Sequence, residues 1–353
     1  MSFFRDNIDR MAAYIPGEQP AAGSKAIKLN TNENPYPPSP KAIEAMRALD
    51  PQLLRRYPQP MADDLRQVAS RVLDVPKDWI LAGNGSDDLL AMIVLACAQP
   101  GRGVVYPMPT YVLYRTLAQM QDAPCIEVPF DDDYSLPVDA LAKANGAVTF
   151  IASPNSPSGT LMPPAALDEL ASRLSGVLVI DEAYADFAAS SALGLVKEHK
   201  NVIVLRTFSK GYSLAGLRLG FGIMQPCLFE GINKVRDSYP VDTVSCAVGA
   251  AAMADQEHKN ACCAKVVASR GRLEAELKRL GYKVWPSQAN FLLAQVPAGR
   301  DAKTIYEQLK AAGILVRYFN EPRLDDKLRI TVGTDDQNAA LVAALDKGVG
   351  HRS

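Results

Sequence analysis

Between residues 79 and 223 the chain alternates between short apolar runs and longer amphipathic segments. Short runs rich in aliphatic and β-branched residues are typical of buried strands, and the amphipathic segments between them are typical of helices. Strands are expected at 79–82, 103–106, 125–128, 147–152, 177–180 and 202–205, with a further apolar segment at 217–223. Helices are expected at 87–98, 110–121, 137–144 and 163–174. This alternation predicts an α/β domain whose parallel sheet is covered on both faces.

The two ends of the chain follow other patterns. Residues 15–40 contain six prolines, which excludes a central strand or a helix interior, so this segment is interpreted as an arm, for example one packed on a neighbouring subunit. Helices are expected from Ser39-Pro40, at 62–73 and along 243–280. Beyond these, strands at 283–285, 290–294, 314–317 and 327–332 and helices at 301–311 and 335–347 indicate a smaller α+β domain. The predicted division is an arm at 1–40, a large domain at 41–255 and a small C-terminal domain at 256–353.

Composition narrows the class of protein. A chain of 353 residues with 48% hydrophobic and 22% charged residues is expected to fold, and to need more than one core. A net charge of −1 provides no basic field for nucleic acid, which favours a small-molecule ligand or a protein partner. No apolar run reaches the roughly 18 residues of a membrane span, and charges interrupt the N-terminus where a signal peptide would be apolar. The six cysteines form no C-x-x-C pair, so we expect a cytoplasmic protein without structural zinc.

Polar residues follow four of the predicted strands. Ligands of an open parallel sheet bind beyond the carboxyl ends of its strands. Residues 83–87, Gly-Asn-Gly-Ser-Asp, lead into a helix N-terminus, where free N–H groups either bind a phosphate or are simply capped. The loop S-P-N-S-P-S-G pins Asn155, and Asp181 and Tyr184 follow the next strand. Lys210 follows the strand at 202–205.

Each of these features has an ordinary structural explanation on its own, and an isolated lysine after a strand is usually a solvated turn residue. Together they supply phosphate donors, a carboxylate, an amide, a phenol and a lysine. Lysine forms Schiff bases with carbonyl compounds. Pyridoxal phosphate exploits this reaction and needs an acidic partner that keeps its pyridine nitrogen protonated. The combination therefore indicates a pyridoxal-phosphate site.

Several motifs carry a resemblance to known enzymes. The segments S-P-N-x-P-x-G, D-E-A-Y and T-F-S-K-x-x-x-L-A-G-L-R-x-G resemble those of fold-type I pyridoxal-phosphate aminotransferases. The arm L-N-T-N-E-N-P-Y-P-P-S-P and the turn R-R-Y-P are similar to the histidinol-phosphate aminotransferase family. The resemblance spans residues 14–333. It implies a large domain with a mostly parallel seven-stranded sheet, a small C-terminal domain, and amino transfer between L-histidinol phosphate and 2-oxoglutarate in histidine biosynthesis.

The resemblance also implies roles for individual residues around the cofactor. Lys210 would hold pyridoxal 5′-phosphate covalently and act as the catalytic proton carrier, and Asp181 would pair with the pyridinium nitrogen. Asn155 and Tyr184 would bind the 3′-oxygen, and Tyr111 would stack on the ring. The cofactor phosphate would be surrounded by Gly85, Ser86, Asp87, Thr207, Ser209 and Arg218.

Further implied contacts involve the substrate and a second subunit. Tyr57 would reach the cofactor phosphate of a neighbouring subunit, which implies a homodimer with shared active sites. Arg329 would bind the anionic end of the substrate. Arg317 and Tyr14 are further candidate substrate contacts, although a surface salt bridge would equally explain Arg317.

Three alternatives remain open from the sequence. The lysine is followed by Gly211-Tyr212-Ser213 where the family often has Ala-Phe-Gly, so an aromatic amino acid could replace histidinol phosphate as the donor. A decarboxylase of threonine phosphate would use the same cofactor. The ligand-sensing half of a transcription regulator would need an N-terminal DNA-binding domain, and the sequence shows no helix-turn-helix pattern.

Overall fold

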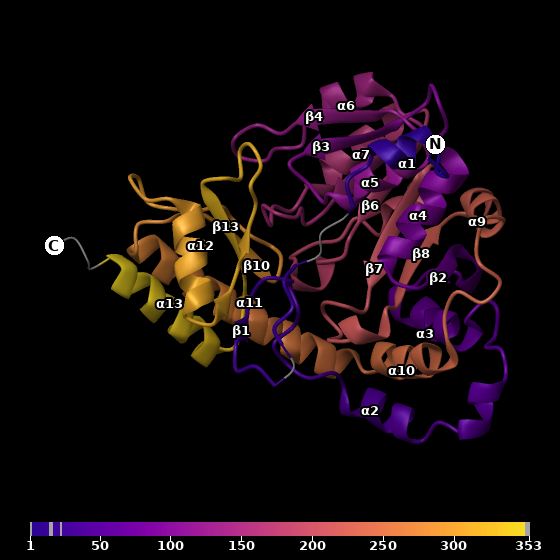
Figure 1. Cartoon of the computed structure of the whole chain (residues 1–353). Coiled ribbons are helices and arrows are strands. Elements are labelled where there is room, and N and C mark those ends of the chain that lie inside the picture. Colours follow the sequence, from indigo (N-terminus) through magenta and orange to yellow (C-terminus); the bar gives the residue numbers. More distant parts are fainter. Residues whose placement is uncertain (1, 14–16, 22, 350–353) are drawn as a thin grey trace.

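A seven-stranded sheet forms the centre of the larger part of the molecule (Figure 1). In the computed structural model, which describes residues 2–13, 17–21 and 23–349, its strand order is β2-β8-β7-β6-β5-β3-β4. The strands are β2 (Ile80–Gly83), β3 (Val104–Met108), β4 (Cys125–Pro129), β5 (Val148–Ala152), β6 (Val177–Asp181), β7 (Val202–Thr207) and β8 (Gly220–Met224). The prediction of an α/β fold with a mostly parallel sheet is confirmed.

Strand direction brings the predicted site residues to one edge of this sheet. Neighbouring strands are parallel along the part of the sheet with the order β7-β6-β5-β3-β4. β8 is antiparallel to both β7 and β2, so β2 runs in the same direction as β7. The carboxyl ends of β2, β5, β6 and β7 therefore lie at the same edge.

The sheet is buried on both faces because its apolar strand residues alternate between two cores. Phe150 and Ile203 belong to one hydrophobic cluster, and their neighbours Ile151 and Val204 belong to the other, as the two-residue period of a strand requires. The first face is covered by α4 (Ser86–Cys97), α5 (Leu113–Met120) and α9 (Pro226–Asn233). The second is covered by α3 (Asp63–Leu73), α6 (Val138–Ala144), α7 (Pro164–Arg173) and α10 (Thr243–Ala254).

The predicted helical stretch at 243–280 is two helices and not one. α10 ends at Ala254, and α11 (Gln256–Arg279) begins after Asp255. The carboxylate of Asp255 accepts hydrogen bonds from Ser39 Oγ at 2.5 Å and from Lys41 Nζ at 3.0 Å, so it is tied to the start of α2 (Pro40–Arg47). The break lies where α11 leaves the large sheet, and we propose it as the boundary between the large and small domains.

The C-terminal part is built on a four-stranded antiparallel sheet of order β12-β13-β10-β9. Its strands are β9 (Lys283–Val284), β10 (Phe291–Gln295), β12 (Arg317–Tyr318) and β13 (Lys327–Thr331), and its helices are α11, α12 (Ala302–Ala311) and α13 (Asp335–Val349). The predicted strand at 314–317 is divided, because β11 (Ile314–Leu315) pairs with β1 (Ile27–Lys28) of the arm instead of with β13.

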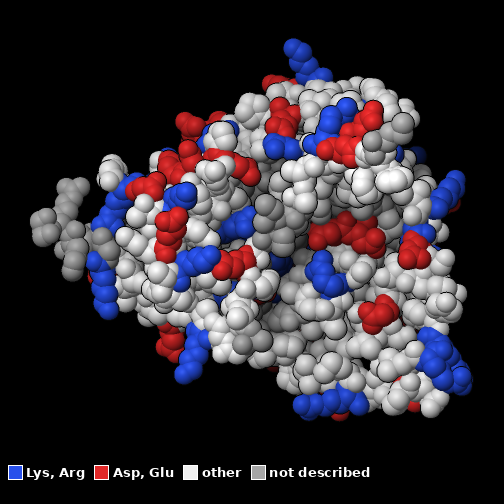
Figure 2. Space-filling view, in the orientation of Figure 1, with Lys and Arg blue, Asp and Glu red and all other residues white. Residues whose placement is uncertain are grey.

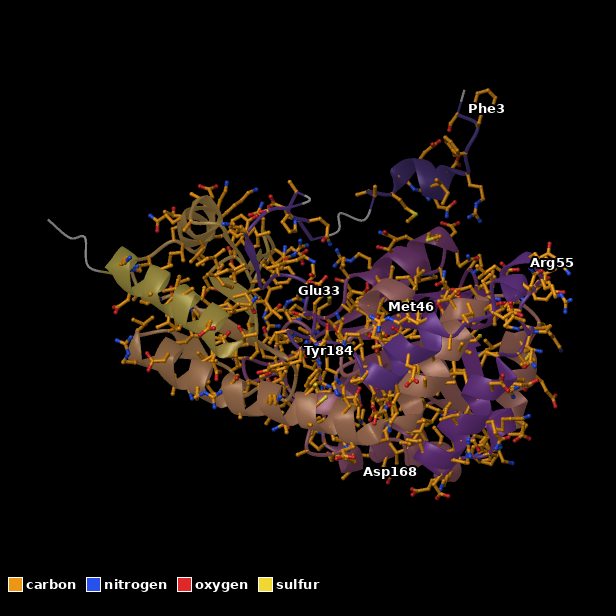
Figure 3. All side chains as sticks on the ribbon, turned by 90° about the horizontal axis from the view of Figure 1, so that it is seen from below. Phe3, Glu33, Met46, Arg55, Asp168 and Tyr184 are labelled. Carbon is orange, nitrogen blue, oxygen red and sulfur yellow. The ribbon has the colours of Figure 1, made fainter. Side chains whose placement is uncertain are left out.

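The arm at residues 27–34 packs on the small domain of its own chain. Beyond the β1–β11 pair, Leu29 O accepts from the N–H of Thr331 at 2.9 Å, and Asn290 Nδ2 donates to Asn32 O at 2.9 Å. The short helix α1 (Asp6–Arg10) was not predicted, since five residues are too few to show a period. Asn7 Nδ2 anchors it to Gln119 O at the end of α5, and Phe3 projects away from the body of the molecule (Figure 3).

The remaining helical elements are short. They are α8 (Leu195–Glu198) and the 3₁₀ turns η1 (Pro51–Arg55), η2 (Lys77–Trp79), η3 (Ala185–Phe187) and η4 (Ala215–Leu217). Among the described residues, none of the helices combines the length and the apolar character that crossing a membrane requires.

Candidate active site

A cavity of about 270 Å³ opens at the carboxyl edge of the large sheet, and residues of the arm and the small domain complete its walls. Figure 2 shows charged side chains of both signs around the hollow between the two parts of the molecule. The predicted site residues that line the cavity are Ser86, Asp87, Tyr111, Asp181, Tyr184, Thr207, Ser209, Lys210, Arg218, Arg317 and Arg329. The fold thus brings together residues that are far apart in the sequence.

Lys210 lies in the turn after β7, with its amine in the cavity. Its Nζ donates a hydrogen bond to the carbonyl oxygen of Thr31 in the arm at 3.1 Å and lies 5.7 Å from the centroid of the Tyr184 ring. The following residue has to be small, because a Cβ on Gly211 would overlap the carboxylate of Asp186. The lysine is therefore held between the arm and the residues that follow β6.

The unusual residues after Lys210 face away from the cavity. Tyr212 is only 9% exposed, and its hydroxyl accepts a hydrogen bond from Gln256 Nε2 at 2.9 Å. The same hydroxyl lies 3.1 Å from Met253 Sδ. Tyr212 therefore packs against α10 and α11, and residues 211–213 are not among those that line the cavity.

Asp181 is the last residue of β6 and is only 5% exposed. Its carboxylate accepts hydrogen bonds from Tyr114 Oη at 2.9 Å and from the N–H of Ala183 at 3.1 Å. Burial raises the pKa of Asp181 from 3.8 to about 6, although these two hydrogen bonds lower it. Burial, together with the charge of Asp181, raises the pKa of Tyr114 well above its ordinary value. Tyr114 therefore keeps its proton and acts as the donor.

The N-terminus of α4 and Arg218 form an anion-binding corner. Gly85 has a φ of 88°, which favours glycine, and a Cβ there would lie 2.9 Å from Arg218 Nη2 and would displace that guanidinium. Arg218 donates to Asp87 Oδ2 at 3.1 Å and to Ser209 Oγ at 3.4 Å. Tyr111 Oη donates to the other oxygen of Asp87 at 3.2 Å. A guanidinium and a helix N-terminus together favour a phosphate at this corner.

Asn155 lies behind the cavity wall that Thr110, Pro154 and Ser156 form. It is fully buried. Its amide nitrogen donates to Pro109 O at 3.2 Å and to Ser158 Oγ at 3.0 Å, and its Oδ1 accepts from Thr110 Oγ1 at 2.7 Å. Both amide hydrogens are thus used, one by Ser158 of the same loop and one by Pro109, which follows β3.

Two arginines of the small domain face the cavity from the opposite side. Arg329 on β13 donates to Ser156 Oγ at 2.9 Å and to Asn30 O at 3.0 Å. The guanidiniums of Arg329 and Arg317 lie 5.5 Å and 5.3 Å from the centroid of the Phe319 ring. This shared ring keeps the two cations near each other, which suits a dianionic ligand.

One predicted contact, Tyr57, lies outside the cavity. Tyr57 is on the surface, 81% exposed, and its ring stacks on Tyr239 with centroids 4.5 Å apart. Tyr14 is outside the described residues.

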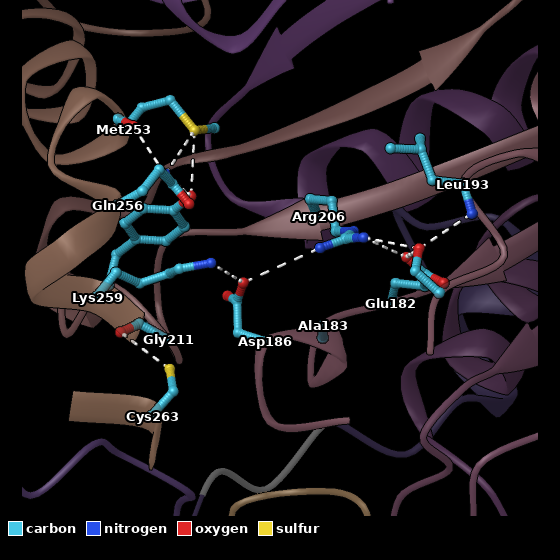
Figure 4. A network of polar contacts seen from close by, with 12 residues as sticks. Glu182, Ala183, Asp186, Leu193, Arg206, Gly211, Met253, Gln256, Lys259 and Cys263 are labelled. Atoms are coloured by element: carbon cyan, nitrogen blue, oxygen red, sulfur yellow. Dashed lines mark hydrogen bonds and ion pairs between the residues drawn. The ribbon is translucent and has the colours of Figure 1, made fainter. Parts of the chain in front are cut away.

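A network of ion pairs connects the ends of neighbouring strands of the large sheet to a helix (Figure 4). Arg206 on β7 pairs with Glu182 at 2.7 Å and lies 4.0 Å from Asp186, which pairs with Lys259 of α11 at 3.0 Å. The side chain of Glu182 is 1% exposed, and a carboxylate at that depth needs a cation. The network joins the residues that follow β6 to β7 and α11.

The functional residues that the sequence did not reveal are Thr31, Asn32 and Tyr114. Thr31 and Asn32 belong to the arm motif, which carries no ionisable group at these positions. Tyr114 lies one helical turn after Tyr111, so a search of that helix for a partner of Asp181 would have found it.

The geometry agrees with comparisons against known proteins. The family model for aminotransferases of class I and II matches residues 24–345. The chain belongs to this family. Histidinol-phosphate aminotransferase 1 of Trichormus variabilis is 59% identical over 344 residues, which cover 98% of this chain and 98% of that relative. The histidinol-phosphate aminotransferase of Rhodopirellula baltica is 42% identical over 98% of this chain and 96% of its own length.

A solved structure of a relative is also similar to this chain over nearly its whole length. Histidinol-phosphate aminotransferase from Sinorhizobium meliloti, in complex with pyridoxal-5′-phosphate, has a TM-score of 0.89 at 28% identity, covering 98% of this chain and 97% of that one. The predicted family, the fold-type I architecture and the class of enzyme, a transaminase, are confirmed.

Proposed function

We propose that the chain is a histidinol-phosphate aminotransferase that carries pyridoxal 5′-phosphate on Lys210. The observation that carries the proposal is that Lys210, Asp181 and the Gly85–Arg218 corner meet in one cavity, opposite Arg317 and Arg329. Relatives named as this enzyme, at 59% and 42% identity over nearly the whole chain, support the choice of substrate.

The residues of the cavity fit this cofactor. The N-terminus of α4 with Arg218 suits its phosphate, and the buried carboxylate of Asp181 suits its ring nitrogen. Two buried oxygens of lining residues, Asn30 Oδ1 and Thr31 Oγ1, have no hydrogen-bond partner within the described part of the chain, as is expected of atoms whose partner is a ligand. When bound, the cofactor supplies a ring that accepts electrons from the substrate carbon.

Each side chain around the cofactor would either hold or move a proton or form a hydrogen bond to the cofactor ring. Lys210 would form the covalent link and then carry a proton to and from the reacting carbon. Asp181, held by Tyr114, would keep the ring nitrogen protonated. Tyr184 would donate to the 3′-oxygen, and Asn155 can join it once one of its amide hydrogens leaves Pro109 or Ser158.

Arg317 and Arg329 would bind two substrates whose anionic groups differ. Histidinol phosphate has no α-carboxylate, so we propose that its phosphate occupies the site at Arg329 that receives a carboxylate of glutamate in the other half-reaction. Arg317 and Arg329 share the Phe319 ring, and a dianionic phosphate can contact both cations.

The test is to reconstitute the protein with pyridoxal phosphate and add one donor at a time. Histidinol phosphate and glutamate should each convert the cofactor to its amine form, followed by visible absorbance. Conversion by phenylalanine alone would instead identify an aromatic aminotransferase, and carbon dioxide release from threonine phosphate would identify a decarboxylase. Lys210→Ala should lose turnover while its circular dichroism is unchanged, whereas Lys197→Ala, outside the cavity, should remain active.

The same proposal includes a cytoplasmic homodimer with shared sites. Met46, Leu53, Leu54, Tyr57 and Tyr239 are all at least 40% exposed, and large exposed apolar groups favour a protein partner. The six free cysteines suit a reducing compartment. Light scattering should give twice the chain mass. Mixing a Tyr57 variant with a Lys210 variant should restore activity through mixed dimers, and a mixture without activity would argue against shared sites.

A further inference from the structure

Asn32 of the arm contacts the hydroxyl of Tyr184 although it is not one of the predicted site residues. Its Nδ2 lies 2.9 Å from Tyr184 Oη, and Asn32 is 1% exposed. An amide NH₂ group has hydrogens and no acceptor. The oxygen of Tyr184 must therefore accept in this hydrogen bond.

The amide of Asn32 is oriented by Thr331 of the small domain. The backbone N–H of Asn32, which can only donate, lies 3.0 Å from Thr331 Oγ1. The single proton of the Thr331 hydroxyl then serves Asn32 Oδ1 at 3.1 Å. With Oδ1 turned toward Thr331, the NH₂ group has to face Tyr184.

The backbone of Asn32 is held as firmly as its side chain. Its φ is 57°, a left-handed conformation that asparagine adopts more readily than most residues. Its carbonyl oxygen accepts from Asn290 Nδ2 at 2.9 Å, and Asn290 is fully buried. Two side chains of the small domain thus fix the residue that determines the hydrogen-bond direction at Tyr184.

The hydroxyl proton of Tyr184 remains available for the cavity. Among the hydrogen bonds between described residues, the one from Asn32 is the one that Tyr184 Oη makes, and Tyr184 accepts in it. Lys210 Nζ is 5.7 Å from the ring centroid, and it donates its hydrogen bond to Thr31 O. The ring edge is packed against Phe291, at 5.0 Å between centroids, so the ring itself is held in place.

We propose that Asn32 is a positioning residue that obliges Tyr184 to donate its proton to the 3′-oxygen of the bound cofactor. This inference rests on the proposed function. A donated hydrogen bond withdraws negative charge from that oxygen, and the charge would otherwise favour a proton on the Lys210 nitrogen. Asn32 therefore sets the pH at which the lysine nitrogen in the loaded protein gives up its proton.

The main test is Asn32→Asp, which replaces the donor by a group that only accepts. Tyr184 should then donate to the new carboxylate and not to the cofactor. The pH midpoint of the visible absorbance of the loaded protein should rise by about one unit, which is about a tenfold change in proton affinity. The readout is spectroscopic and requires no turnover.

Because a new negative charge alone would also raise the midpoint, the same substitution is made in a Tyr184→Phe background. If Asn32 acts through Tyr184, most of its effect disappears there. An equal shift with and without the Tyr184 hydroxyl would overturn the proposal.

A neutral pair of variants tests the same chain of hydrogen bonds. Thr331→Val loses the hydroxyl that orients Asn32, and Thr331→Ser retains it. Thr331→Val should raise the midpoint, and Thr331→Ser should leave it near the wild-type value. This pair decides the question if Asn32→Asp does not fold, and identical midpoints in the two Thr331 variants would refute the role of Asn32.

A separate experiment tests the proposed function itself. Reduction of the loaded wild-type protein with borohydride, followed by peptide mass analysis, should place a pyridoxyl group on Lys210. Absence of that group would refute the proposed function. Its presence together with unchanged midpoints in the variants would refute only the inference about Asn32.

Discussion

Asp181 leads to a quantitative expectation for the stability of the cofactor-free protein. Burial raises its pKa from 3.8 to about 6, and each pKa unit corresponds to about 1.4 kcal/mol, so the total effect is about 3 kcal/mol. The native state binds this proton more tightly than the unfolded chain does. The contribution therefore favours the native state fully below about pH 4 and is lost as the pH rises through about 6.

Asp181→Asn removes this titration and nearly preserves the shape of the side chain. As the pH rises from about 4.5 to about 7.5, the wild type should lose about 2 kcal/mol of unfolding free energy relative to Asp181→Asn. The loss is smaller than the total effect because the wild type has already lost about a third of it at about pH 4.5. Urea unfolding of both cofactor-free proteins, followed by circular dichroism, measures the difference. Asp133→Asn is the matched control, since that residue is exposed, and its curve should run parallel to that of the wild type.

Two results would refute this reasoning. Parallel pH profiles for Asp181→Asn and the wild type would mean that burial does not perturb the carboxyl group. A difference of the opposite sign would mean that the hydrogen bonds from Tyr114 and Ala183 outweigh burial and hold Asp181 ionised.

Three further substitutions test other contacts. Tyr114→Phe removes a hydrogen bond that lowers the pKa of Asp181, so the pH profile described above should shift to higher pH in unfolding experiments. Gly85→Ala should weaken pyridoxal-phosphate binding in a titration, by about five- to thirtyfold if displacing the Arg218 guanidinium costs about 1–2 kcal/mol. Gly101→Ala, also at positive φ but in open space, should not weaken it. Arg206→Met should lower the unfolding free energy by about 3–5 kcal/mol because Glu182 is left buried without its cation, and a second change, Glu182→Gln, should recover part of that loss.

The large sheet was predictable because most of its strands are buried apolar runs, although the edge strand β4 contains Glu127 and is largely not buried. The expected strand at 177–180 agrees with β6 to within one residue, and that at 202–205 agrees with β7 to within two. The direction of β8 was not predictable, since an apolar run has the same pattern in either direction. The break at Asp255 was missed because no proline or glycine stands at residues 250–270, and the hydrogen bonds that mark it come from Ser39 and Lys41, more than two hundred positions away.

The candidate site was predictable to the extent that its chemistry resides in ionisable groups at strand ends. Lys210, Asp181 and Arg218 are such groups, and all three line the cavity. The contributions of Thr31 and Asn32 could not be inferred in the same way, because they act through a carbonyl oxygen and an amide whose direction only the fold determines. The orientation of Tyr212 was also hidden, because an aromatic residue beside the lysine is as compatible with a cavity wall as with a core.

Three consecutive residues of the arm each bind a different functional group of the site. Asn30 O accepts from Arg329, Thr31 O accepts from Lys210, and Asn32 donates to Tyr184. These partners come from β13, from the turn after β7 and from the residues after β6, so their relative positions depend on the arm as well as on the packing of the two sheets. Since the arm is also paired to the small domain through β1 and β11, a movement of the small domain would shift Arg329 and the hydrogen bonds of Lys210 and Tyr184 together. In the proposed function, the arm would thus link the arginine proposed for substrate binding to the groups proposed to handle protons.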